Sequence, residues 1–129
     1  MPAAENPAAE NPAEPMIDEQ VSFSKIGRAD LVRLAGEIDL ANAPGIGRQI
    51  VARMTESGAV LIDLTAVSFL DSAGVRLLDA LVGDLDDQGT AIRLVVGESG
   101  AARMTLQLCA FRDDLLSTDL QRAAAELES

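Results

Sequence analysis

Residues 60–78 read VLIDLTAVSFLDSAGVRLL, and this stretch decides the fold. Its opening apolar run, residues 60–64, is bounded by turn formers and predicts a buried strand of a parallel sheet. A second apolar patch carries the chain to Asp71 and Ser72. From Gly74 onward, apolar residues recur at steps of three and four, which predicts an amphipathic helix. Asp71 and Ser72 therefore lie where a strand gives way to a helix. The unpaired N–H groups and the positive dipole end there favour an added phosphate.

The segments on either side of this stretch predict an α/β sandwich. A strand from Val21 and a strand over residues 31–38 flank a turn and predict a hairpin, and a helix capped by Asn42 follows. Residues 91–96 form another apolar strand, and a short edge strand is expected near Leu115. The element order is β-β-α-β-α-β-α-(β)-α. It predicts a small mixed sheet of four to five strands with about four α-helices packed on it.

Helical spacing also predicts which side chains face the core. The inward residues are expected to be Ile46, Ile50, Val51 and Met54 in the first helix, Val75, Leu78, Val82 and Leu85 in the second, Met104 and Leu108 in the third, and Leu120, Ala123, Ala124 and Leu127 in the last. Ser99 is expected to cap the third helix, and Thr118 or Asp119 the last. Cys109 is interpreted as a small buried hydrophobe rather than a redox switch.

Residues 1–16 differ from the rest in composition. They repeat Pro, Ala and Glu in a five-residue pattern with nothing bulky to bury, which predicts a disordered tail; a spacer or docking role is the alternative. Residues 17–129 then form one domain. No apolar run approaches the roughly 20 residues of a membrane helix, and no signal peptide opens the chain, so we expect a cytoplasmic protein with no membrane association.

The charge and the missing residue types exclude several functions. The formal net charge is −11, which disfavours direct binding to nucleic acid. There is no histidine and a single cysteine, so neither a Ser-His-Asp site nor an intrachain disulfide can form, and zinc loses its commonest ligand. Gly45-Ile46-Gly47 resembles the start of a dinucleotide-binding motif, but Ile50 stands where the third glycine belongs. We expect no enzyme activity, cofactor or metal.

At this point the motifs identify a family. The chain resembles the STAS domain, and within it the single-domain anti-sigma-factor antagonists. The resemblance rests on Gly-Glu-Ile-Asp at residues 36–39, the strand at 60–64, the Ser-Phe-Leu-Asp-Ser-Ala-Gly loop at 68–74, and the strand-to-helix step from Leu94 to Arg103. Residues 108–111 depart from the family, because they lack the glycine that many relatives place before the apolar residue.

The resemblance implies a phosphorylation switch. In the family, the serine after the aspartate is phosphorylated by the cognate anti-sigma factor, a serine kinase of the histidine-kinase-like ATPase fold, and a PP2C-type phosphatase reverses the step. The unmodified antagonist binds the kinase and releases the sigma factor, typically in transcription control and stress responses. By resemblance, Ser72 is the phosphoacceptor. The partner-binding residues would be Asp39, Leu70, Asp71, Ser72, Gly74 and Val75, in a monomer or weak dimer.

Each of these residues also has a plainer interpretation. In this interpretation Ser72 or Asp71 is only a helix cap, Asp39 caps the exit of its strand, and Gly74 allows close packing. Two other functions stay open as well. One is an unmodified STAS adaptor subunit of a transporter or stress-signalling complex. The other is a small nucleotide-binding or nucleotide-hydrolysing protein that uses Asp39 and Asp71.

Overall fold

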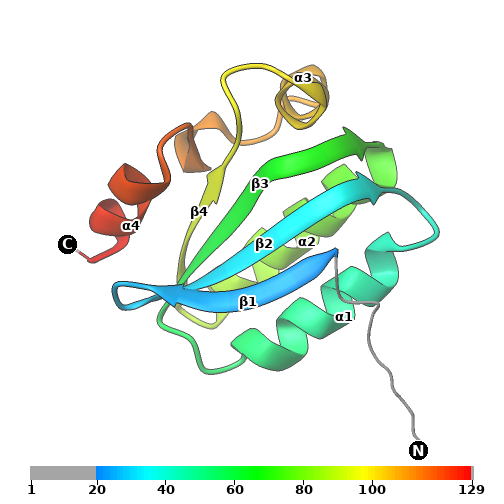
Figure 1. The fold of residues 1–129 in the computed structure, drawn as a ribbon. Helices are drawn as coiled ribbons and strands as arrows, with labels where there is room; N and C mark the ends of the chain where they lie inside the picture. Colours follow the sequence, from blue (N-terminus) through cyan, green and yellow to red (C-terminus); the bar gives the residue numbers. More distant parts are fainter. Residues whose placement is uncertain (1–19, 129) are drawn as a thin grey trace, which may run out of the picture.

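A five-stranded sheet forms the centre of the molecule (Figure 1). The computed structural model describes residues 20–128. The strands follow one another across the sheet in chain order, and only the first pair is antiparallel. The strands are β1 (Val21–Ile26), β2 (Ala29–Ile38), β3 (Ala59–Leu70), β4 (Ala91–Val95) and β5 (Leu116–Ser117). The predicted mixed sheet and the predicted hairpin are both confirmed.

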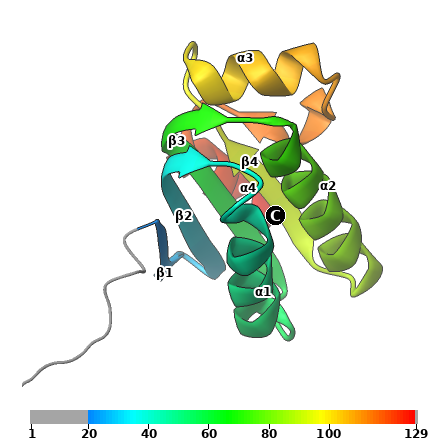
Figure 2. The ribbon, with the colours of Figure 1, turned by 90° about the vertical axis from the view of Figure 1, so that its right-hand side faces the viewer.

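Helices cover both faces of this sheet (Figure 2). The helices are α1 (Ala43–Met54), α2 (Ser72–Asp87), α3 (Ala101–Leu108) and α4 (Leu120–Glu128), with a 3-10 turn, η2 (Asp113–Leu115), before β5. The large core lies between the sheet and α1, α2 and α3. A smaller cluster on the opposite face joins Leu31, Leu61 and Val95 to Ala123 and Ala124 of α4. The predicted element order is confirmed.

Strand β3 is longer than its predicted apolar run. The sequence predicted a strand over residues 60–64 and a separate apolar patch, whereas β3 continues without a break to Leu70. Its first part pairs with both β2 and β4, and its last part pairs with β2 alone, across two register shifts. Gly36, with φ +77°, lies at this irregularity, where its left-handed conformation favours glycine. The shifts leave Ile38 and Leu70 paired at the ends of their strands.

The predicted inner face of α3 is wrong. Met104 and Leu108 are 62% and 80% exposed, and Ala102 and Leu106 are the buried pair instead. Both pairs have the same spacing of four residues, so periodicity alone could not choose between them. Cys109 ends the helix as its C-cap and is exposed rather than buried, because the chain turns there before Phe111 returns to the core.

Three predictions about helix ends and faces also need correction. Asn42 is the N-cap of α1, but its side chain makes no cap hydrogen bond. Gly100, not Ser99, is the N-cap of α3. Val51 is 39% exposed, because it faces α2 across an open groove rather than a filled interior. Asp119 does cap α4, since its Oδ1 accepts a hydrogen bond of 3.0 Å from the Arg122 backbone N–H.

The proposed tail, residues 1–16, lies outside the described residues, as do residues 17–19 and 129 of the proposed domain. Within residues 20–128, the structure contains no helix whose length and apolarity would let it cross a membrane.

Candidate functional site

The candidate site forms where β2 and β3 end side by side. Ile38 and Leu70 are register partners, and the backbone N–H of Asp71 donates a 3.3 Å hydrogen bond to the Ile38 carbonyl oxygen. Asp39 and Asp71 follow these paired residues directly, one on each strand. Because the strands are parallel, both aspartates lie at the same edge of the sheet, as expected. The strand pairing therefore assembles the site from segments more than thirty residues apart.

Asp71 is the N-cap of α2. Its Oδ1 accepts hydrogen bonds from the backbone N–H groups of Ala73, at 2.9 Å, and Gly74, at 3.1 Å. The backbone carbonyl of Asp71 accepts the first helical hydrogen bond, from the N–H of Val75 at 3.1 Å. A carboxylate in this position satisfies helix N–H groups and interacts favourably with the helix dipole. The capping interpretation thus holds for Asp71 and is wrong for Ser72.

Ser72 is the first residue of α2, and it is exposed. Within residues 20–128, the structure shows no hydrogen bond made by its hydroxyl group. The sequence suggested that N–H groups at the helix end could hold a phosphate. Two of those groups, on Ala73 and Gly74, are already bound by the Asp71 carboxylate. A phosphate on Ser72 must therefore find other partners or displace Asp71.

Asp39 is also held by local hydrogen bonds. Its Oδ1 accepts from the backbone N–H groups of Ala41, at 3.0 Å, and Asn42, at 3.2 Å. In return, the backbone N–H of Asp39 donates to Oδ1 of Asn42 at 2.9 Å. The Asn42 amide also donates to the Glu37 carbonyl oxygen at 2.8 Å. Asp39 thus shapes the turn from β2 into α1, as its plainer interpretation predicted.

Leu70 and Gly74 lie beneath the exposed residues of the site. Leu70 is buried, and Val75 is half-buried against the core. A Cβ atom added to Gly74 would overlap Leu70 Cδ1 and would lie 3.2 Å from Ile38 Cγ2. Gly74 therefore lets α2 approach the ends of β2 and β3 closely, which is the packing role expected of it. In this structure Leu70 and Gly74 shape the site from below.

Phe69 is an exposed aromatic residue that the sequence reasoning left out of the site. It is 47% exposed, and it precedes the buried Leu70 at the end of β3. Side chains on a strand point alternately to its two faces, so a buried Leu70 implies an outward Phe69. This alternation was the signal available in the sequence.

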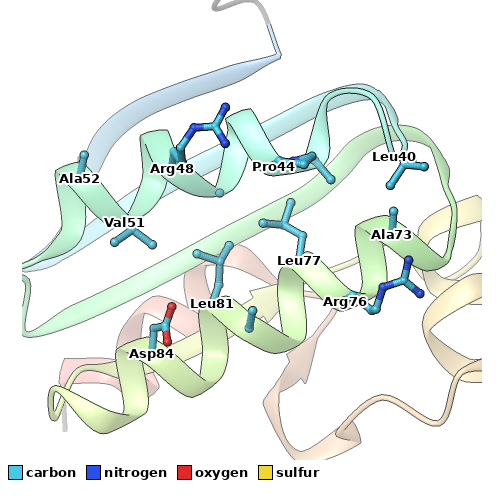
Figure 3. A pocket seen from close by; sticks show the side chains of 13 residues that line it. Leu40, Pro44, Arg48, Val51, Ala52, Ala73, Arg76, Leu77, Leu81 and Asp84 are labelled. Carbon is cyan, nitrogen blue, oxygen red and sulfur yellow. The ribbon is translucent and has the colours of Figure 1, made fainter.

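An apolar groove runs between α1 and α2 beside the site (Figure 3). We call it the α1–α2 groove; it has a volume of about 580 Å³. Leu40 and Val51 line one side, Leu77 and Leu81 line the other, and Arg48 and Arg76 lie at its edges. Ala73, the residue after Ser72, is part of its wall. No pattern in the sequence predicted this groove.

The described residues offer no gathered metal ligands. Within residues 20–128, no three carboxylate or thiol side chains come together in a way that could hold a metal ion. The two carboxylates of the candidate site, those of Asp39 and Asp71, each direct one oxygen at backbone N–H groups. The arrangement thus presents an exposed hydroxyl group beside an apolar groove, on a surface fixed by backbone hydrogen bonds.

The chain is similar to known proteins in both sequence and fold. The family model for the STAS domain matches residues 20–125. The crystal structure of an anti-sigma factor antagonist from Mycobacterium paratuberculosis has a TM-score of 0.74 and 27% sequence identity, over 84% of this chain and 93% of that one. No curated protein matches the sequence.

Two further structures share the fold. The anti-sigma factor antagonist SpoIIAA in its unphosphorylated form has a TM-score of 0.70 and 19% identity, over 84% of this chain and 96% of that one. SpoIIAA from Bacillus in its phosphorylated form has a TM-score of 0.63 and 19% identity, over 84% of this chain and 99% of that one. At this level of identity the likeness concerns the fold alone.

Proposed function

This chain belongs to the STAS domain family, and we propose that it acts as an anti-sigma factor antagonist switched by phosphorylation of Ser72. The unmodified chain binds an anti-sigma factor and so releases the sigma factor. The observation that carries the proposal is the exposed Ser72 hydroxyl group at the first position of α2, directly after the capping Asp71. The 27% identity to an anti-sigma factor antagonist, over most of both chains, supports the same role.

The anti-sigma factor is proposed to be the kinase. The terminal phosphoryl group of ATP passes to Oγ of Ser72, ADP leaves, and the hydroxyl proton is lost to a base on the kinase. Two half-buried side chains near Ser72, those of Asp39 and Val75, complete the contact surface, while Leu70 and Gly74 support it from below. A PP2C-type phosphatase removes the phosphate by hydrolysis. The chain itself acts as a binding module in the cytoplasm and catalyses no reaction.

Electrostatics gives the switch its direction. Phosphorylation adds about −1.5 to −2 charges beside Asp71. The chain already carries a formal net charge of −11. A docked partner would then have to desolvate the phosphate next to another carboxylate. A coupling of about 1–3 kcal/mol would change the affinity roughly five- to 150-fold.

Arg76 provides a counter-charge for this phosphate. It lies four residues after Ser72 in the same helix, so the two side chains share one face with their Cβ atoms about 5–6 Å apart. A guanidinium group can bind phosphate through two parallel hydrogen bonds. Because Asp71 occupies the nearby N–H groups, Arg76 is the cation best placed to pair with the phosphate. The modification would then act on the surface without changing the fold.

The proposal is tested by phosphopeptide mass spectrometry on the protein isolated from its own cells, growing and stressed, with bound proteins identified. Trypsin should release residues 54–76 as one peptide, within which fragment ions distinguish Ser72 from Ser57 and Ser68. We expect phosphate on Ser72 that changes with stress, together with a bound ATPase-fold protein. Absence of phosphate under both conditions would move the chain to the class of unmodified STAS adaptors.

Binding measurements with the purified kinase then test the switch itself. Ser72→Ala should bind the kinase whether or not ATP is present, while Ser72→Glu and Ser72→Asp should bind poorly. Ser99→Glu is the matched control, since it adds the same charge at an exposed serine before α3. Equal affinity for Ser72→Ala, Ser72→Glu and the control would contradict the switch.

A further inference from the structure

The α1–α2 groove exposes large apolar side chains beside the phosphorylation site. Leu40, on the turn into α1, is 70% exposed, and Val51 on α1 is 39% exposed. In Figure 3, Val51 points across the groove toward Leu81 and Leu77 of α2. Burying these side chains against a partner would be favourable, because removing apolar surface from water lowers the free energy. An exposed apolar patch with a polar rim is typical of interaction sites.

Charged side chains of opposite sign lie at the two ends of the groove. Arg76 lies at the end near Ser72, Asp84 lies at the other end, and Arg48 lies between them on the α1 side. Within residues 20–128, no salt bridge pairs either arginine. Arg76 and Asp84 are eight residues apart on one helix, which corresponds to roughly 12 Å. This length matches about two turns of a helix.

We propose that the α1–α2 groove binds an amphipathic helix of the anti-sigma factor. The apolar stripe of that helix fills the groove against Leu40, Val51 and Leu77. An acidic side chain at one end pairs with Arg76, and a basic side chain at the other end pairs with Asp84. An amphipathic helix in an apolar groove is a recurring mode of recognition. This inference rests on the proposed function, because it names the surface through which that function is exerted.

Arg76 links the groove to the phosphorylation site. It lies at the edge of the groove and also one helical turn from Ser72, while Ala73 contributes to the groove wall. Phosphate on Ser72 competes with the acidic side chain of the partner for Arg76 and repels that side chain. The loss of affinity on phosphorylation then follows from a single shared cation.

The other possible occupants fit less well. Two copies of a chain with a net charge of −11 repel each other, so a second copy would face an electrostatic cost. A small ligand is usually enclosed over most of its surface, whereas this groove is open along its length (Figure 3). A helix laid along the groove covers the apolar side chains and meets the charges at both ends.

Calorimetry with the full-length chain and the purified anti-sigma factor tests the inference. Leu40→Ser and Arg76→Gln should each weaken binding by at least about fivefold, the loss expected for an important contact residue. Both side chains are exposed, so the variants should fold, as circular dichroism would verify. Met104→Ser on α3 and Arg122→Gln on α4 are matched controls at exposed positions away from the groove, and both should bind as the wild type does.

The outcomes separate this inference from the proposed function. If Ser72→Glu weakens binding while Leu40→Ser and Arg76→Gln bind as the wild type does, the groove is not the docking surface and the switch stands. If the unmodified wild type does not bind the anti-sigma factor, both ideas fail. If light scattering shows a dimer of the wild type that Leu40→Ser converts to a monomer without changing the affinity for the anti-sigma factor, a second copy occupies the groove and the inference is wrong.

Discussion

Replacing Gly74 by alanine tests whether close packing sets the position of the proposed phosphorylation site. An added Cβ would overlap Leu70 Cδ1 and crowd Ile38 Cγ2, so Leu70 or α2 must move. Overpacking of this kind costs about 1–3 kcal/mol. Gly83 is the matched control in the same helix, because a Cβ there would meet no described heavy atom within 4 Å beyond the adjacent backbone of α2 and its chain neighbours. Gly83→Ala should therefore show the gain in helix propensity alone, about 1 kcal/mol.

The two variants should consequently differ by at least about 1–3 kcal/mol, with Gly83→Ala the more stable, since any propensity gain in the first turn at Gly74 is no larger. For a domain of this size the difference corresponds to roughly 4–12 °C in Tm. Urea titration followed by far-ultraviolet circular dichroism measures it, because the chain has no tryptophan or tyrosine for fluorescence. Leu70→Val, which removes the overlapping branch, should recover part of the loss in the Gly74→Ala background. A Gly74→Ala protein as stable as Gly83→Ala would refute the packing argument.

Two further predictions concern the phosphate and the end of α3. In the chain phosphorylated at Ser72, Arg76→Gln should raise the second pKa of the phosphate, because the guanidinium favours the dianion. For an exposed pair worth about 0.2–1 kcal/mol, the rise is about 0.1–0.7 pKa units. Titration followed by phosphorus NMR measures it, with Arg122→Gln as the control, and an unchanged pKa would exclude the pairing. Ala110 has φ +54°, in the left-handed region that favours glycine. Ala110→Gly should therefore raise the free energy of unfolding by about 0.5–1 kcal/mol, and a lower value in urea titration would contradict this.

The Ala110 conformation explains a departure that was visible in the sequence. The family resemblance predicted a glycine before the apolar residue that follows this helix, and this chain has Ala110 before Phe111. The structure shows why a glycine suits that position. The chain must turn sharply for the N–H of Phe111 to reach the Leu106 carbonyl oxygen at 3.0 Å. A local motif thus predicted a local backbone requirement.

Local signals also predicted the junction at Asp71 and Ser72, because a cap residue, a change of period and a glycine all lie within a few residues. The groove was not predictable in this way. Val51 fits the apolar period of α1, and only its distance from α2 decides whether it is covered. That distance depends on contacts between the helices, such as the one at Gly47, where an added Cβ would lie 2.7 Å from Leu77 Cδ1. Periodicity assigns a side chain to a face, but it does not give the separation between two faces.

The capping role of Asp71 limits how a phosphate on Ser72 can be held. Its carboxylate takes the N–H groups of Ala73 and Gly74, so the helix end has little left with which to bury a phosphate on Ser72. A phosphate at this position would stay exposed and charged, within reach of Arg76 and of any protein docked nearby. An exposed phosphate is accessible to a phosphatase and repels a partner without altering the fold. We therefore expect phosphorylation to change the affinity for the partner strongly and the free energy of unfolding only slightly.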